Sequence, residues 1–319
     1  PGSRIAATAQ RLSVKAKIMM ALFALMLIPQ AAWAQSLYPV YIGSEQLTRA
    51  NIGNYPGMSY SPDTQALTLN NTTLTSTISW SDFNSDLCIR LKGSNSITIS
   101  GATKSCIDCD YSNASTIYSR VLFEKGDDDC ELILQCPDGA NLIDGFSAIN
   151  YEGVRRVSLS EGKNAGDPNK ASIEAVYLSV AGRAVSKSSF AGSATSCNIT
   201  GTNITSGTVT YDKSTSELTL NNAEISYSSG DAIVYERGDM DLNVKLVGLS
   251  TIDCGGNYAF NGNTSHDMKF TTTAADAGGL VLASTRNPFD TQSYYSGFNQ
   301  VIAGSGLFGG YSVGSPNND

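Results

Sequence analysis

The second half of the chain repeats the first. The block SPDTQALTLNNTTL, which starts at residue 61, returns as DKSTSELTLNNAEI from residue 212. Later segments also match: 131–134 resembles 279–282, and 151–154 resembles 295–298. A repeat of this length indicates a modular architecture, and it says nothing by itself about chemistry.

Within each repeat, apolar residues alternate with polar ones in short runs bounded by Gly, Asn, Asp and Ser. The clearest runs are 67–69, 87–91, 132–134, 218–220 and 244–246. Side chains two apart on a strand point to the same face, so each run predicts a strand with one buried face. No helical periodicity follows residue 34. We therefore predict an all-β protein.

The spacing of these runs favours one all-β architecture. Leu69 and Leu91 are 22 residues apart, Leu220 and Leu246 are 26 apart, and the 43 residues from Leu91 to Leu134 fit two such intervals. Units of this size are typical of one turn of a β-solenoid. We predict two tandem modules, each a right-handed parallel β-helix. Antiparallel β-sandwich modules remain the alternative, since hairpins could account for part of the pattern.

Two kinds of turn stand out. Segment 121–129 resembles 233–241 and, more faintly, 78–86, which predicts equivalent corners; Gly126 and Gly238 would supply left-handed backbone there. Asparagine pairs at 70–71 and 221–222 directly follow inward leucines. Asparagine tolerates positive φ and forms local hydrogen bonds, so these pairs predict structural turns.

The module boundaries follow from composition. We place the first module at 38–160, a polar linker rich in Gly and Pro at 161–174, the second module at 175–311 and a disordered tail at 312–319. Similar strands at 38–43 and 175–180 open the two modules, where they would cap the exposed end of each stack.

Residues 1–34 have the pattern of an export signal with a short upstream segment. Basic residues precede an apolar run from 18 to 28, and Ala32-Trp33-Ala34 supplies small residues for cleavage. We expect a secreted protein, extracellular or on the cell surface, with the periplasm as the alternative, and no membrane insertion after cleavage. Without the 4 basic residues of this segment, 17 basic residues face 29 acidic ones. An acidic surface excludes nucleic acid as a partner.

The seven cysteines are an odd number for an oxidising compartment. Cys106 and Cys109 have metal-ligand spacing, but neither a second pair nor a nearby histidine completes a zinc site. We interpret the cysteines as buried small hydrophobic residues.

Asp127, Asp128 and Asp129 form the strongest metal candidate, because clustered carboxylates can hold calcium. Calcium is the only cofactor that the sequence suggests. The spaced acids of a specific calcium loop are missing, and Met240 replaces the middle acid in the second copy. A solvated acidic turn is the favoured interpretation.

An enzyme of the pectin-degrading type is the main catalytic alternative. Such a polysaccharide lyase or glycoside hydrolase of β-helix type needs several acidic or histidine elements, and only Gly126-Asp127-Asp128 matches one of them. His266 lies in a polar turn that has no counterpart in the first module. We therefore assign no catalytic residue.

Aromatic rings are the candidate ligand-binding residues, since flat rings stack on sugars. Trp80, Phe123 and Tyr235 fall at the same place in the echoed segments, and Tyr151 and Tyr295 could extend the row. The alternative is that these rings fill the core.

The blocks YSPDTQALTLNNTTL and YDKSTSELTLNNAEI, each followed by a segment such as DLCIRLKGSNSI or DLNVKLVGLSTI, resemble repeats in secreted surface proteins of gut Bacteroidetes and Firmicutes. Such proteins are often labelled carbohydrate-binding or adhesin-like. The resemblance implies a parallel β-helical fold and a non-catalytic extracellular protein that binds polysaccharide or host glycans. A passive structural stalk or matrix component is the further alternative.

Overall fold

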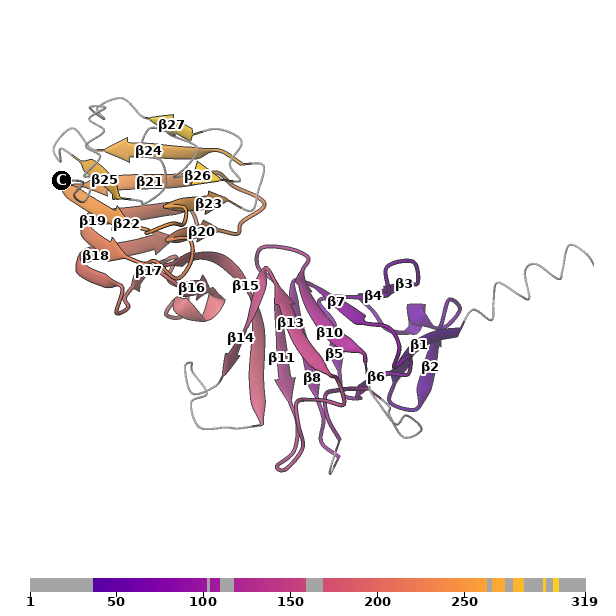
Figure 1. Cartoon of the computed structure of the whole chain (residues 1–319). Helices are drawn as coiled ribbons and strands as arrows, with labels where there is room; N and C mark the ends of the chain where they lie inside the picture. Colours follow the sequence, from indigo (N-terminus) through magenta and orange to yellow (C-terminus); the bar gives the residue numbers. More distant parts are fainter. Residues whose placement is uncertain are drawn as a thin grey trace, which may run out of the picture.

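The computed structural model describes residues 37–101, 104–109, 118–158, 169–262, 266–272, 278–283, 295–296 and 301–303. These residues form strands and two short 3-10 helices, η1 (Ile52–Asn54) and η3 (Lys187–Ser189). The prediction of an all-β protein is confirmed. The strands gather in two groups that lie side by side along the molecule, with β1 in one and β25 in the other (Figure 1).

The first group contains three ladders of parallel strands. The first ladder joins β4 (Ala66–Asn70), β7 (Leu87–Lys92), β10 (Arg120–Lys125) and β13 (Ala148–Glu152). The second joins β6 (Ile78–Trp80), β9 (Ile107–Cys109) and β12 (Ile143–Asp144). The third joins β5 (Thr73–Leu74), β8 (Ser94–Thr98) and β11 (Glu131–Gln135). From β4 onward the chain visits the first, third and second ladders in that order and then starts again.

The second group follows the same order. Its first ladder joins β19 (Glu217–Ser226), β21 (Leu242–Val247), β24 (Met268–Thr272) and β27 (Val301–Ala303). Its second joins β20 (Ile233–Tyr235), β23 (Phe260–Gly262) and β26 (Tyr295–Ser296). Its third joins the end of β19 to β22 (Leu249–Asp253) and β25 (Gly279–Ala283).

Antiparallel strands open both groups. In the first they are β1 (Leu37–Ile42), β2 (Glu45–Thr48) and β3 (Met58–Ser61). In the second they are the end of β15 (Lys170–Val180), β16 (Arg183–Ser186), β17 (Ser196–Ile199) and β18 (Ile204–Asp212). The pairs Ile42 with Ile78 and Val180 with Ile233 are equivalent. The predicted opening strands are thus present in both groups.

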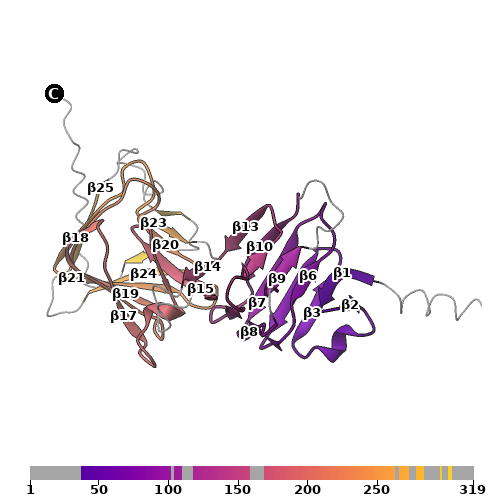
Figure 2. The ribbon, with the colours of Figure 1, turned by 90° about the horizontal axis from the view of Figure 1, so that it is seen from below.

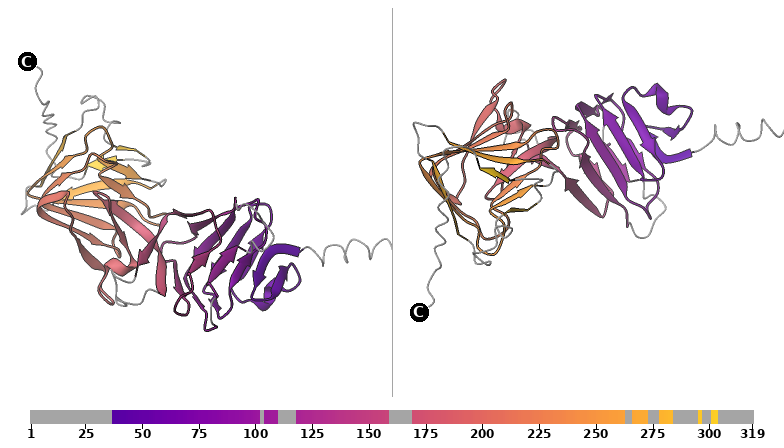
Figure 3. Two further views of the ribbon diagram at one scale, coloured as in Figure 1. Left: turned by 60° about the horizontal axis from the view of Figure 1, so that its bottom comes forward. Right: turned by 90° about the horizontal axis from the view of Figure 1, so that it is seen from above.

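Strand β15 belongs to both groups of strands. Its first half pairs with β11 and with β14 (Val154–Ser158), whereas its second half pairs with β16 and β20. Lys170 to Glu174, which we predicted as the end of a linker, are therefore strand residues; residues 161–168 lie outside the described part. Views from below and from two further directions place β14 and β15 where the two groups meet (Figures 2 and 3).

Each group has its own hydrophobic core, and the division falls between Ala175 and Tyr177. The inward leucines pair in parallel register as the spacing predicts, for example Leu67 with Ile89 and Leu69 with Leu91. Leu134 does not continue this series, because β11 lies in the third ladder, where Leu134 pairs with Ile97.

The asparagine turns are confirmed at atomic detail. Asn71 and Asn222 have φ of 53° and 47°. Their side-chain Oδ1 atoms accept hydrogen bonds from the backbone N–H of Ser94 (3.1 Å) and Leu249 (3.3 Å), on the next pass of the chain. Each asparagine therefore fixes its own turn and ties it to the next one.

The predicted corner equivalence is wrong. The corner after β10 leads into β11 of a third ladder, whereas the corner after β20 leads into β21 of a first ladder. Segment 78–86, with β6 before β7, is the true counterpart of 233–241. Gly126 and Gly238 also lack positive φ. Residue 126 is glycine for a steric reason instead, because a Cβ there would lie 2.4 Å from the Leu91 carbonyl oxygen.

The sequence match of 151–154 to 295–298 likewise aligns strands that lie in different ladders. Tyr151 lies in β13 of a first ladder, and Tyr295 lies in β26 of a second ladder. The counterpart of β13 is β27.

Candidate functional site

The rings of Trp80, Phe123 and Tyr235 are fully buried. Trp80 Nε1 donates a hydrogen bond to the Ser85 carbonyl oxygen (3.0 Å), and the Tyr235 hydroxyl donates to that of Met240 (2.7 Å). No face of these rings reaches solvent, so the prediction that they bind a ligand is wrong and they fill the core.

Tyr151 is half-buried and stacks on Phe123, with ring centroids 5.8 Å apart. The side chain of Tyr295 lies outside the described part of the structure. Trp80 and Tyr235 are structural equivalents, since each faces an opening strand, but Phe123 belongs to another ladder. The five predicted rings therefore do not form a single row.

The three predicted metal ligands point to different partners. Asp127 accepts a hydrogen bond from the Gly93 N–H (2.7 Å), and Asp128 forms an ion pair with Lys125 (2.8 Å). Asp129 accepts from the Tyr177 hydroxyl (2.8 Å). Among the residues that the structure describes, no three His, Cys, Asp or Glu side chains are placed to hold a metal ion. The acidic corner is therefore engaged with protein donors.

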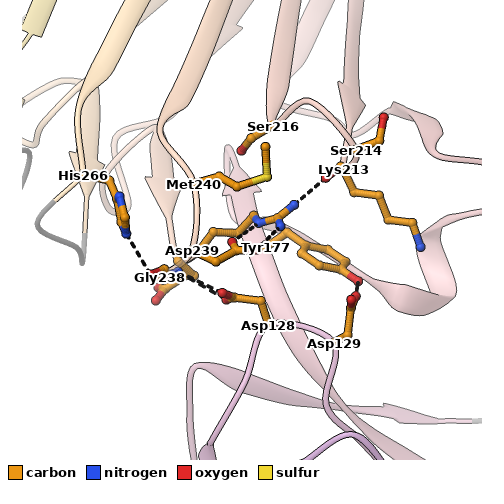
Figure 4. Close-up of polar contacts among 12 residues, drawn as sticks. Asp128, Asp129, Tyr177, Lys213, Ser214, Ser216, Gly238, Asp239, Met240 and His266 are labelled. Atoms are coloured by element: carbon orange, nitrogen blue, oxygen red, sulfur yellow. Dashed lines mark hydrogen bonds and ion pairs between the residues drawn. The ribbon is translucent and has the colours of Figure 1, made fainter.

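Two of these acids contact the second group of strands (Figure 4). The Asp128 carboxylate accepts from the Gly238 N–H at 3.2 Å, and the Tyr177 that donates to Asp129 belongs to the second core. Lys125 Nζ donates to the Glu236 carbonyl oxygen. The corner at 126–129 thus meets the corner at 236–239, and we call these contacts the joint.

Arg237 stabilises the corner at 236–239, which is the part of the joint in the second group. Its Nε and Nη2 donate to Asp239 at 2.8 and 2.6 Å, its Nη1 donates to the Lys213 carbonyl oxygen, and its guanidinium lies 5.5 Å from the Tyr177 ring centroid. The hydrogen bond from Arg237 holds the pKa of Asp239 below its usual value. Burial, followed by the hydrogen bond to Asp129, raises the pKa of Tyr177. The joint is a charge-compensated structural contact.

His266 also borders the joint. Its Nε2 lies 2.7 Å from the Gly238 carbonyl oxygen, and its Nδ1 lies 3.6 Å from Asp241 Oδ1. Asp241 in turn pairs with Lys269 at 2.6 Å. His266 is therefore held beside the corner at 236–239.

Five of the seven cysteines are buried, and Cys88 and Cys197 are half-buried. Burial, with the neighbouring Cys136, raises the pKa of the Cys106 thiol to about 12. A thiol of this kind stays protonated at neutral pH and behaves as a small hydrophobic residue. This agrees with the predicted role.

Sequence reasoning missed a row of polar side chains on the outer face of the second group. The members lie on five neighbouring strands and each pairs with the next: Asn198, Thr210, Thr219, Lys245 and Thr271. Their neighbours along the strands are buried, apart from Cys197 and Thr272, which are half-buried, so the row faces outward. We call it the polar row. The alternation of apolar and polar residues in each strand indicates which side chains face outward. Only the pairing of the strands shows that these five side chains are neighbours.

The corresponding row of the first group differs in charge. It contains Ser59, Thr68, Arg90, Glu124 and Glu152. Arg90 is bound to Glu124 at 2.6 Å, whereas Lys245, its counterpart in the polar row, lies 4.0 Å from Glu217. Edge strand β17 extends the second sheet beyond β18. The two rows are equally long, and the polar row is the less charged of the two, with one charged residue against three.

Comparison with protein-family models, with curated proteins and with solved structures finds no match to this chain. In the described part, no helix has the length and apolar character needed to cross a membrane.

Proposed function

We propose that each group of strands is a module with a right-handed parallel β-helical fold. The recurring order of the three parallel ladders supports this proposal. Connections between parallel strands of one sheet are right-handed in about 98% of cases, which supports the hand. Among the described strands, antiparallel pairs are confined to those that open the modules and to β14 and β15. The sandwich alternative has no comparable support.

We further propose that the protein is a non-catalytic, secreted surface protein that binds polysaccharide. The observation that carries this proposal is the polar row, which presents hydroxyl, amide and ammonium groups on five adjacent strands. Within the described residues, the side chains of Asn198, Thr210 and Thr271 make no hydrogen bond to protein, so they are free to bind sugar hydroxyls. Protein donors and acceptors of this kind fix the orientation of bound sugars.

The test is a glycan array followed by affinity electrophoresis of the full chain in gels that contain each polysaccharide. We expect retardation by at least one polysaccharide. Lys245→Ala should reduce it, because Lys245 lies in the polar row. Arg90→Ala is the matched control, since Arg90 occupies the same position in the first module.

Absence of binding to every glycan would reject this function and leave a passive stalk or matrix component as the interpretation. Equal loss of binding in the two variants would reject the polar row as the site. Release of products from any polysaccharide would contradict a non-catalytic role.

A further inference from the structure

We propose that the polar row binds an extended, neutral, β-1,4-linked glycan that crosses the strands with one sugar ring over each strand. This inference rests on the proposed function and adds the class of ligand and its direction on the surface.

The first argument is the spacing along the row. Neighbouring strands lie about 4.8 Å apart, so side chains in one row repeat at that interval. This interval is close to the length of one ring in an extended β-1,4-linked chain. A chain lying across the strands therefore presents a new ring to each of β17, β18, β19, β21 and β24. An α-1,4-linked chain of glucose coils and cannot keep this correspondence.

The second argument is the chemistry of the row. Four of its five members are uncharged: Asn198, Thr210, Thr219 and Thr271. Hydroxyl and amide groups exchange hydrogen bonds with ring hydroxyls as both donors and acceptors. Thr219 already donates to Glu217 at 3.3 Å, so its oxygen is oriented to accept a further hydrogen bond.

The third argument is the charge beside the row. The adjacent row on the same strands contains Ser196, Asp212, Glu217, Asn243 and Lys269. Across both rows, the two lysines Lys245 and Lys269 balance the two acids Asp212 and Glu217, so the net charge is zero. Lys269 is also bound to Asp241 at 2.6 Å. The face therefore has no cationic excess to attract an acidic polysaccharide, and a neutral glycan fits it better.

The experiment is titration calorimetry of the full chain with β-1,4-linked glucose oligomers of two to six rings, and with α-1,4-linked oligomers of the same lengths. We expect the affinity for the β-linked series to rise with each ring up to five and then level off. The α-linked series should stay weak at all lengths. A β-1,4-linked oligomer of uronic acid should bind more weakly than the neutral one.

Thr219→Val removes one hydroxyl from the centre of the row at constant shape. It should weaken binding of the five-ring β-linked oligomer about fivefold, as expected for one lost hydrogen bond. Thr68→Val, at the same position of the first module, should leave it unchanged. Melting temperatures of both variants check that they fold.

The outcomes separate the two proposals. Polysaccharide could bind with an affinity that is constant beyond two rings, or the α-linked series could bind equally well. In either case the glycan class and its direction across the strands are wrong, and the binding function stands. If Thr219→Val has no effect, the row is not the contact. If no glycan of any class binds, the function itself fails.

Discussion

At the scale of single residues, a tight constraint is the contact between each turn asparagine and a glycine on the next pass. Gly93 and Gly248 have φ of +57° and +63°, and a Cβ at these positions would lie 2.3 and 2.1 Å from the Oδ1 of Asn71 and Asn222. Gly248→Ala should therefore lower the free energy of unfolding by about 2 to 3 kcal/mol, from backbone strain and displacement of the asparagine. Urea denaturation measures this loss.

Gly201→Ala is the control for that experiment. A Cβ at Gly201 meets nothing within 4 Å, and its φ is not positive. The change should leave the free energy of unfolding within about 0.5 kcal/mol of the parent value. Equal effects of the two substitutions would contradict the role of the asparagine turn.

At the scale of elements, strand β15 contributes one half to each core. Ile173 is buried in the first core and Leu178 in the second. Replacing either by Ala should cost about 2 to 5 kcal/mol, through lost burial and a cavity. Hydrogen exchange should locate the damage: Ile173→Ala should speed exchange in β8 and β11, and Leu178→Ala in β20 and β23. Faster exchange throughout both modules in either variant would show that the cores are not separate.

The strands themselves were predictable, because alternation of apolar and polar residues directly reports one buried face. The asparagine turns were predictable for a similar local reason, since a positive φ favours few residue types. Both signals depend only on neighbouring residues.

The assignment of strands to ladders was not predictable from the same signals. Alternation tells which side chains point inward but not which of three sheets a strand joins. The segments 121–129 and 233–241 therefore seemed equivalent although they turn different corners. For the same reason the sequence could not tell a core ring such as Phe123 from an exposed one, and could not assemble the polar row from five distant segments.

At the scale of the whole molecule, the joint should respond to acid. Because Arg237 lowers the pKa of Asp239 in the folded protein, the ionised carboxylate stabilises the fold at pH values above the pKa of the unfolded chain. That contribution is lost as the pH falls through the lowered pKa. Stability should therefore decrease from about pH 4 downward. The Asp239→Asn variant should lose stability less steeply than the parent as the pH falls. Thermal melts recorded from neutral to acidic pH measure this difference.

Asp63→Asn is the comparison, because Asp63 is exposed in the turn between β3 and β4, away from the joint. Its melts should follow the parent at every pH. A parent slope that survives unchanged in Asp239→Asn would show that the joint does not sense protonation at this carboxyl.

The double membership of β15 also limits how the gene can change. An ordinary connector between domains tolerates insertions and deletions, but one extra codon between Ala175 and Tyr177 would turn every later side chain of the strand to the opposite face. Leu178 and Val180 would then leave their core. We therefore expect the number of residues between the two halves to tolerate change as poorly as a buried side chain does, and recombination to move the two modules together as a single cassette.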